Sequence, residues 1–151
     1  MSNSSSVPGW VAVEAILRAG RAAIDELHRR LAERGHPDVR PAHGYAFQAV
    51  GTAGTTAGEL GQRLGVTKQA AGQMVDELVR LGYVDRTPDP GDGRRRLVTL
   101  TPRGFDCLRA SAEIFDELLA EWRAQGDDVD AAITALGGLA ELYGGRLRPI
   151  W

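Results

Sequence analysis

Residues 55–104 read TTAGELGQRLGVTKQAAGQMVDELVRLGYVDRTPDPGDGRRRLVTLTPRG, and this stretch decides the fold. It opens with a capping box, in which the side chains of Thr56 and Glu59 can each accept a hydrogen bond from the other residue's backbone N–H. A helix of about eight residues is therefore predicted here, ended by Gly65 in the left-handed conformation. Thr67 is predicted to cap a second, longer helix.

A hairpin is predicted next, because the hydrophobic period changes from that of a helix to two. Two strands are expected over residues 83–87 and 96–100, joined by a loop over residues 88–93 that is rich in Pro, Gly and Asp. Thr101 and Pro102 then fit the N-cap and the first position of a long helix. Two short helices and a hairpin in this order are the plan of a winged helix-turn-helix, whose second helix enters the DNA major groove.

Amphipathic helices flank this lobe on both sides. In residues 10–34 apolar side chains repeat at alternating spacings of four and three, a stripe that fits either the core of one domain or the surface of a second subunit. The helices predicted outside the quoted stretch span about residues 10–34, 42–50, 102–125 and 128–147.

The predicted fold class is mostly α with a small β-hairpin: a winged helix-turn-helix with N- and C-terminal dimerisation helices. The predicted divisions are a disordered tail at 1–9, dimerisation helices at 10–37 and 102–151, and a DNA-binding lobe at 38–101. The residues predicted at the dimer interface are Val13, Leu17, Ile24, Leu136 and Leu147.

The composition excludes several classes of protein. The chain has 151 residues with 18 basic and 20 acidic side chains, so no overall positive charge marks it as a nucleic-acid binder. No apolar run approaches the ~20 residues of a membrane helix, one cysteine cannot form an internal disulfide, and the first residues lack the pattern of a signal peptide. A soluble, cytoplasmic protein with no membrane partner is expected. Motifs of phosphate loops, nucleophile elbows, zinc proteases and dinucleotide sites are missing, so neither an enzyme nor a cofactor is expected.

Four linked motifs in the quoted stretch closely resemble the MarR (multiple antibiotic resistance regulator) family. They are the helix-turn-helix E-L-x-x-x-L-G-V-T, the link V-D-E-L-x-x-x-G-Y-V-x-R, the wing D-P-x-D-x-R and the L-T-x-x-G that opens the long helix. The flanking helices match the family's layout by position. The resemblance implies a homodimeric transcriptional regulator of the repressor type, often with a small-molecule effector.

The charge distribution agrees with contact to DNA. Residues 58–104 hold eight basic and six acidic side chains, whereas residues 105–151 hold four basic and nine acidic ones. The segment with the DNA-reading shape is thus the basic one, which fits contact with phosphates. The residues expected to contact DNA are Thr67, Lys68, Gln69, Gly72, Gln73, Arg86, Arg94, Arg95 and Arg96.

On the second helix of the motif, glutamine can pair bidentately with adenine, and Lys68 can reach guanine or phosphate. Thr67 can bind a phosphate at the helix N-terminus. Gly72 lowers the stability of its helix by about 1 kcal/mol relative to alanine. We expect it to allow either close approach to DNA or tight packing against the neighbouring helix. Asp76 is expected to be structural, in an i, i+4 pair with Arg80.

In the predicted wing, residues 94–96 fit either a solvated charged strand end or a DNA contact, and their place beside the tight turn favours DNA. The resemblance implies that Arg94 contacts the minor groove or the backbone and that Asp92 braces the loop. Arg86 matches the family's strand arginine and is expected either to contact phosphate or to pair with Asp92. Gly93 stands where many relatives carry another arginine.

Three further groups of residues could sense a signal. Cys107 lies one position off the apolar stripe of the long helix, which consists of Phe105, Leu108, Ala112, Phe115, Leu119 and Trp122. Peroxide-sensing relatives instead carry their cysteine in the first helix. His28, His36 and His43 have spacings that give no local metal-ligand pair, so surface or capping roles are expected and no metal is predicted. Aromatic side chains fit either an effector pocket between the two lobes or ordinary core packing. These are Trp10, Tyr45, Phe47, Phe115 and Trp122.

The predicted function is sequence-specific binding of a pseudo-palindromic operator in double-stranded DNA by a homodimer. The homodimer would act as a repressor, and a small aromatic effector would release it. Two alternatives stay open. One is a winged-helix module that binds protein, in which the basic wing would be idle, and the other is a ligand-binding protein without DNA binding.

Overall fold

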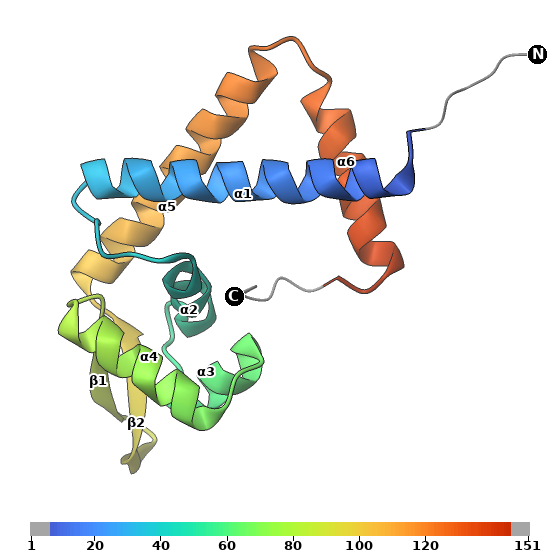
Figure 1. The fold of residues 1–151 in the computed structure, drawn as a ribbon. Helices are drawn as coiled ribbons and strands as arrows, with labels where there is room; N and C mark the ends of the chain where they lie inside the picture. The colour runs from blue at the N-terminus through green and yellow to red at the C-terminus, as the bar shows by residue number, and fades with distance from the viewer. Residues whose placement is uncertain (1–6, 146–151) are drawn as a thin grey trace, which may run out of the picture.

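The computed structural model describes residues 7–145, which form six helices and one two-stranded antiparallel sheet (Figure 1). The elements are, in chain order, α1 (Gly9–Glu33), α2 (Pro41–Val50), α3 (Ala57–Leu64), α4 (Lys68–Arg80), β1 (Val84–Asp89), β2 (Asp92–Leu100), α5 (Pro102–Arg123) and α6 (Val129–Leu142). The predicted fold class, mostly α with a small hairpin in winged helix-turn-helix order, is confirmed. None of the helices in this part of the chain is long and apolar enough to span a membrane.

The predicted helix caps are present in the lobe. Thr56 Oγ1 accepts a hydrogen bond from the backbone N–H of Glu59 at 3.2 Å, and the Glu59 carboxylate accepts one from the N–H of Thr56 at 3.1 Å. Gly65 ends α3 with φ 70°, in the left-handed region that favours glycine. Thr101 Oγ1 accepts from the N–H of Gly104 at 3.1 Å and begins α5. These local signals therefore fix the starts of α3 and α5.

The hairpin is longer than predicted, and the loop expected over residues 88–93 is wrong. The strands pair from Val84–Leu100 to Pro88–Arg96, and β1 continues to Asp89, so that only two residues separate β1 from β2. A register shift after Pro88 absorbs the irregularity. Proline is tolerated here because a two-stranded sheet consists of edge strands, where a missing N–H need not break a ladder.

A third short piece of backbone joins the hairpin. The segment before α3 ends in Thr55, whose N–H donates to the carbonyl of Val98 at 3.0 Å, while the N–H of Val98 donates to the carbonyl of Thr55 at 2.7 Å. Gly54, just before it, has φ +78°, and a Cβ there would lie 3.0 Å from the carbonyl oxygen of Val98. This bridge attaches the start of α3 directly to β2.

The hydrophobic core lies between α2, α3, α4 and the hairpin, and extends to the facing sides of α1 and α5. Its largest fully buried side chains include Tyr83, Phe47, Leu31, Leu60, Leu78 and Ile114. Each apolar side chain of this size contributes about 1.5–3 kcal/mol when it is fully buried. The winged lobe and the facing sides of α1 and α5 therefore share one core, on which the surface side chains are positioned.

The face of α5 that packs on this core differs from the predicted stripe by one position. Cys107 and Ile114 are fully buried, whereas Phe105 and Phe115 of the predicted stripe are 43% and 40% exposed. The helix is apolar on two adjacent faces, so its hydrophobic period alone did not identify the one that meets the core. Cys107 is accordingly a core residue.

Helices α1 and α6 carry a second apolar surface away from the lobe. In Figure 1, α5 rises from the hairpin past α1, and α6 then turns back and crosses the N-terminal half of α1 in this view. Val129 is the one buried residue of α6. Exposed apolar side chains on these helices include Val13, Leu17, Ile133, Leu136, Leu139 and Leu142.

Three of the predicted dimer residues, Val13, Leu17 and Leu136, thus lie on the apolar surface of α1 and α6. Ile24 is half-buried and packs against the core of its own chain. Leu147 lies outside the described residues, as do the first six residues of the predicted tail.

Candidate nucleic-acid interface

The first two turns of α4 project from the lobe. Thr67 Oγ1 accepts a hydrogen bond from the N–H of Ala70 at 3.1 Å, which caps the helix as predicted. The buried side of α4 consists of Ala71, Val75 and Leu78. The side chains of Thr67, Lys68, Gln69 and Gln73 are exposed. An exposed, capped helix N-terminus with amide and ammonium groups can hydrogen-bond to base edges and phosphates.

Gly61, and not Gly72, sets the close packing of α3 on α4. A Cβ on Gly61 would lie 3.1 Å from the carbonyl oxygen of Val66 and 3.4 Å from the Cβ of Ala71, whereas a Cβ on Gly72 would meet no atom within 4 Å. The expectation that Gly72 could serve helix packing is therefore wrong. The space in front of Gly72 is open, on the half-buried flank of the exposed turns of α4.

The carboxylates of α4 are held by arginines from neighbouring elements. Asp76 pairs with Arg86 of β1 at 2.6 Å, so the predicted pair of Asp76 with Arg80 is wrong. The reason is geometric: β1 passes beside α4 and places the guanidinium of Arg86 next to the Asp76 carboxylate. Glu77 pairs with Arg40, which precedes α2. Arg86 is thus paired within the lobe and not with Asp92, and its predicted contact with phosphate stays a prediction.

The tip of the wing is braced by aspartates. The Asp92 carboxylate accepts from the N–H of Arg94 at 3.0 Å, and the Asp89 carboxylate accepts from the N–H of Gly91 at 2.9 Å. The bracing role predicted for Asp92 agrees with this geometry. The turn holds the backbone at Arg94 and leaves its side chain exposed.

The three arginines of the wing have different surroundings. The Arg95 guanidinium lies 3.0 Å from Glu59 of α3 and 3.7 Å from Asp89 of β1. Lys68, Arg94 and Arg96 are exposed and form no ion pair with any residue between 7 and 145. The positive charge that can meet a phosphate is therefore concentrated at Lys68, Arg94 and Arg96.

A polar cluster that the sequence did not reveal, in which His36 and Tyr83 are buried, joins the lobe to the flanking helices. The Tyr83 hydroxyl lies 3.1 Å from His36 Nδ1 and accepts a hydrogen bond from Arg103 at 3.1 Å, while His36 Nε2 lies 3.1 Å from the Asp106 carboxylate. Burial raises the pKa of the Tyr83 hydroxyl, and hydrogen bonds from Arg109 and then His36 lower the pKa of Asp106. The connection after α1, the start of β1 and the first turn of α5 meet at this cluster.

Surface or capping roles were predicted for the three histidines, and two of the three are not surface residues. His36 and His43 are 3% and 0% exposed. The predicted capping role is seen at His43, whose Nδ1 accepts from the N–H of Arg40 at 3.2 Å. Burial, and then the charge of Arg40, lower the pKa of His43. No group of three possible metal ligands occurs in the described part of the chain.

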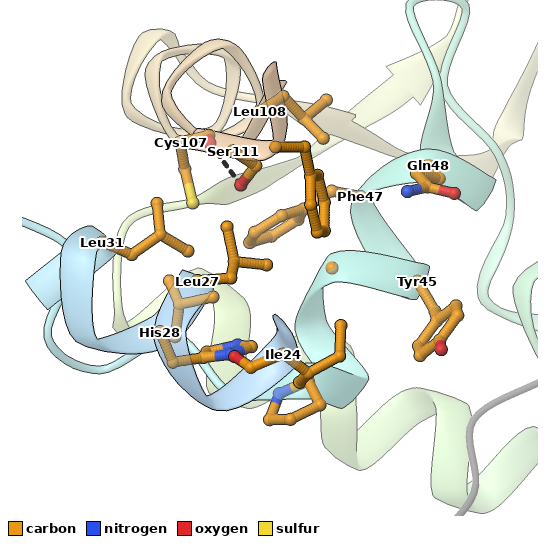
Figure 2. Close-up of a pocket in the computed structure, with 14 residues that line it drawn as sticks. Ile24, Leu27, His28, Leu31, Tyr45, Phe47, Gln48, Cys107, Leu108 and Ser111 are labelled. Carbon is orange, nitrogen blue, oxygen red and sulfur yellow. Dashed lines mark hydrogen bonds between the residues drawn. The ribbon is translucent and has the colours of Figure 1, made fainter. Parts of the chain in front are cut away.

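A cavity of about 100 Å³ opens between α1, α2 and α5 (Figure 2). In Figure 2, Leu27 and His28 approach it from α1, Phe47 and Tyr45 from α2, and Cys107 from α5. Its lining contains no lysine, arginine, aspartate or glutamate. Of the five aromatic residues proposed for an effector pocket, Tyr45, Phe47 and Phe115 line it, whereas Trp10 and Trp122 do not.

Comparison with known families identifies the lobe. Residues 38–95 match the model of the MarR family. A LexA repressor of Deinococcus radiodurans is 32% identical over 109 residues, which cover 68% of this chain and 50% of that protein. A HTH-type transcriptional regulator of Mycobacterium bovis, Mb0904, is 35% identical over 66 residues, which cover 44% of this chain and 46% of that protein. The chain thus spans about half the length of the curated relatives it matches.

Solved structures with the same fold extend over nearly the whole chain. RV1404 from Mycobacterium tuberculosis has a TM-score of 0.72 at 25% identity, covering 97% of this chain and 99% of its own. Wild-type MarR from E. coli has a TM-score of 0.64 at 23% identity, and the match covers 91% of this chain and 98% of that chain. MepR of S. aureus, solved in complex with DNA, has a TM-score of 0.65 at 18% identity, and the match covers 88% of this chain and 96% of that chain. The flanking helices therefore belong to the shared fold together with the winged lobe.

Proposed function

The chain belongs to the MarR family of transcriptional regulators, and from this premise we propose that it binds a pseudo-palindromic operator in duplex DNA as a homodimer and represses transcription there. The observation that carries the proposal is the exposure, on one lobe, of the capped N-terminal turns of α4 together with wing arginines that have no partner carboxylate among the described residues. In this arrangement α4 reads the major groove while the wing contacts the backbone or the minor groove. A regulator that binds DNA in this way would act in the cytoplasm.

Within this proposal the contacts divide into two classes. Gln69 and Gln73 point from the exposed side of α4 and would read base edges, because an amide can pair bidentately with adenine. Thr67, Lys68, Arg94 and Arg96 would bind phosphates and position the lobe. Arg86 has a carboxylate partner of its own and would serve to orient α4 on the hairpin.

Pairing of two chains follows from the apolar surface of α1 and α6. Exposed leucine and isoleucine side chains on these helices carry a free-energy cost in water that a second copy would remove. A two-fold pair would place two α4 helices about one DNA turn apart, roughly 34–36 Å. The operator would then be a pseudo-palindrome with matching half-site spacing.

We propose that the cavity between α1, α2 and α5 binds a small, uncharged aromatic effector. A carboxylate or ammonium ligand would lose its hydration there without meeting an opposite charge from a lysine, arginine, aspartate or glutamate, because the lining contains none of these residues. An apolar cavity of roughly 150 Å³ holds one benzene ring, and this cavity, at about 100 Å³, is smaller. We therefore limit the proposed ligand to a single small ring. It lies where the winged lobe meets the flanking helices, so a ligand that prefers another separation of the two α4 helices would release DNA.

Electrophoretic mobility shift on DNA selected from a random pool, titrated with salt, tests the proposal. We expect tight, sequence-dependent binding that falls steeply as salt rises, because phosphate contacts release counterions. Arg94→Ala should weaken binding to all sequences, whereas Gln73→Ala should relax preference at one base position by about 1–3 kcal/mol. Failure to shift any duplex would instead support a module that binds protein or a ligand-binding protein without DNA binding.

A further inference from the structure

Arg95 differs from its two neighbours in the wing, and the difference lies in its partners. Its guanidinium donates to Glu59 Oε1 at 3.0 Å, and its Nε lies 3.7 Å from Asp89 Oδ2. Two carboxylates thus flank one guanidinium. A phosphate that approached Arg95 would also meet these two carboxylates, which oppose its binding.

Glu59 connects this guanidinium to the first turn of α3. Its Oε2 accepts from the N–H of Thr56 at 3.1 Å and from the hydroxyl of Thr55 at 3.0 Å. Those two hydrogen bonds lower the pKa of the Glu59 carboxyl, so it stays ionised and able to hold Arg95. One carboxylate therefore completes the cap of α3 and binds the wing.

The wing is attached to α3 at two points along β2. The first is the backbone bridge of Thr55 with Val98, and the second is the ion pair of Glu59 with Arg95, three residues farther toward the tip. Two points of attachment fix a direction, whereas the bridge alone would leave the outer half of the strand free to pivot. Because Gly61 packs α3 tightly on α4, the direction of the wing is fixed relative to α4 as well.

From this geometry we propose that Arg95 is a positioning residue that ties the wing to α3 and makes no phosphate contact. Arg94 and Arg96 carry the DNA-facing charge, and Arg95 holds the strand that presents them. The inference rests on the proposed DNA binding for its functional consequence. The attachment itself is a property of the free protein.

The test compares the salt dependence of DNA affinity in matched variants. The logarithm of the affinity falls with the logarithm of salt concentration by about 0.9 for each phosphate contact. We expect Arg94→Gln to reduce this slope by about 0.9. Arg95→Gln should lower affinity for the operator with the slope unchanged. An equal loss of slope in the two variants would overturn the proposal.

Glu59→Gln provides the reciprocal variant. Glutamine also serves at this position of a capping box, so α3 keeps its cap while Arg95 loses its main counter-charge. The released guanidinium should then reach phosphate, which would steepen the slope for random DNA and tighten that binding several-fold. In the double variant with Arg95→Gln this gain should disappear, and its persistence would contradict the proposal.

A measurement on the free protein separates this inference from the proposed function. Backbone order parameters of residues 91–94, from ¹⁵N relaxation, should fall toward the flexible range below about 0.6 in Arg95→Gln. They should stay at the wild-type value in Arg94→Gln. If the wild-type protein bound no DNA but the wing loosened as described, the DNA proposal would fail and the positioning role would stand. An unchanged wing in Arg95→Gln would overturn the positioning role.

Discussion

A Cβ on Gly104 would lie 2.3 Å from the carbonyl oxygen of Tyr83 and 3.1 Å from a methyl group of Leu100. The first turn of α5 therefore packs directly against the backbone that leads into β1. The same carbonyl oxygen accepts a hydrogen bond from the N–H of Thr101 at 3.1 Å. Glycine is required at position 104 because the backbone of α5 and the backbone of Tyr83 approach each other closely. Its φ does not require glycine, because φ lies in the ordinary helical range.

Gly104→Ala should consequently destabilise the protein. The backbone of Tyr83 cannot move without disturbing its buried ring, so we expect a loss of about 1–3 kcal/mol in the free energy of unfolding, typical of overpacking. Urea denaturation followed by circular dichroism measures this quantity. Gly58→Ala is the matched control, since a Cβ there would meet no atom within 4 Å, and equal stability of the two variants would contradict the argument.

Gly72→Ala should have opposite effects on stability and on DNA binding. Alanine raises helix stability by about 1 kcal/mol in the interior of a helix, and the space around Gly72 is open. The added methyl group would, however, stand between α4 and the DNA that the proposal places there. Thermal unfolding should shift upward while operator affinity falls in the mobility-shift assay. A variant that is more stable and binds as tightly as the wild type would show that Gly72 does not face DNA.

Leu17→Asp and Leu136→Asp should each yield monomers. A carboxylate at the centre of an apolar interface must be desolvated without a partner, and this costs several kcal/mol. Both leucines are largely exposed in the single chain, at 62% and 42%, so the fold should survive the change. Sedimentation equilibrium measures the mass.

Val79→Asp is the control for this experiment. Val79 is an exposed apolar residue of α4, at 37%, away from the helices in question. It should leave the mass unchanged. If the two leucine variants also sedimented with the wild-type mass, α1 and α6 would have to be removed from the interface.

Short-range signals predicted the parts of the fold that depend on neighbouring residues. Thr56, Thr67 and Thr101 cap helices as their sequence patterns indicated, because an N-cap is satisfied within three residues. The hairpin loop was misplaced because Pro and Gly mark turns only on average. At the free edges of a two-stranded sheet, proline can sit within the strand.

Partners across the chain could not be predicted in this way. Asp76 was assigned to Arg80 because the two are close in sequence, but Arg86 reaches it from β1. Arg95 was grouped with its neighbours by charge alone, and the carboxylate that holds it comes from α3. The buried contact of His36 with Tyr83 likewise joins residues 47 positions apart. Such pairs are set by topology, which local periodicity does not encode.

The stability of the fold should fall as pH drops below 6.5, through His43. Its pKa is lowered in the folded state, mainly by burial, from an ordinary value of 6.5. The unfolded chain therefore takes up a proton first, and stability is lost as pH falls from about 6.5 toward the folded pKa. Carboxyl groups whose pKa is also lowered, such as Asp106 and Glu117, act only below about 4.5.

Urea denaturation at steps between pH 7.5 and 5 measures this effect, with His43→Gln as the comparison. Glutamine does not titrate, and at this position of the helix it can still accept the hydrogen bond from the N–H of Arg40. The variant should lose the decline between pH 6.5 and 5. Parallel curves for the two proteins would assign the decline to another group.

Cys107 should react slowly with thiol reagents in the folded protein. Its side chain is fully buried, and burial raises the pKa of the thiol from 9.0 to about 11. Because the thiolate is the reactive form, its population at pH 8 is lower by about two orders of magnitude than in an ordinary cysteine. The thiol should react with a chromogenic disulfide reagent at least about a hundredfold more slowly in buffer than in denaturant, where this single cysteine is exposed. Rapid release from the folded protein would mean that the cavity beside Cys107 opens to solvent, and it would restore a redox role that the buried thiol otherwise opposes.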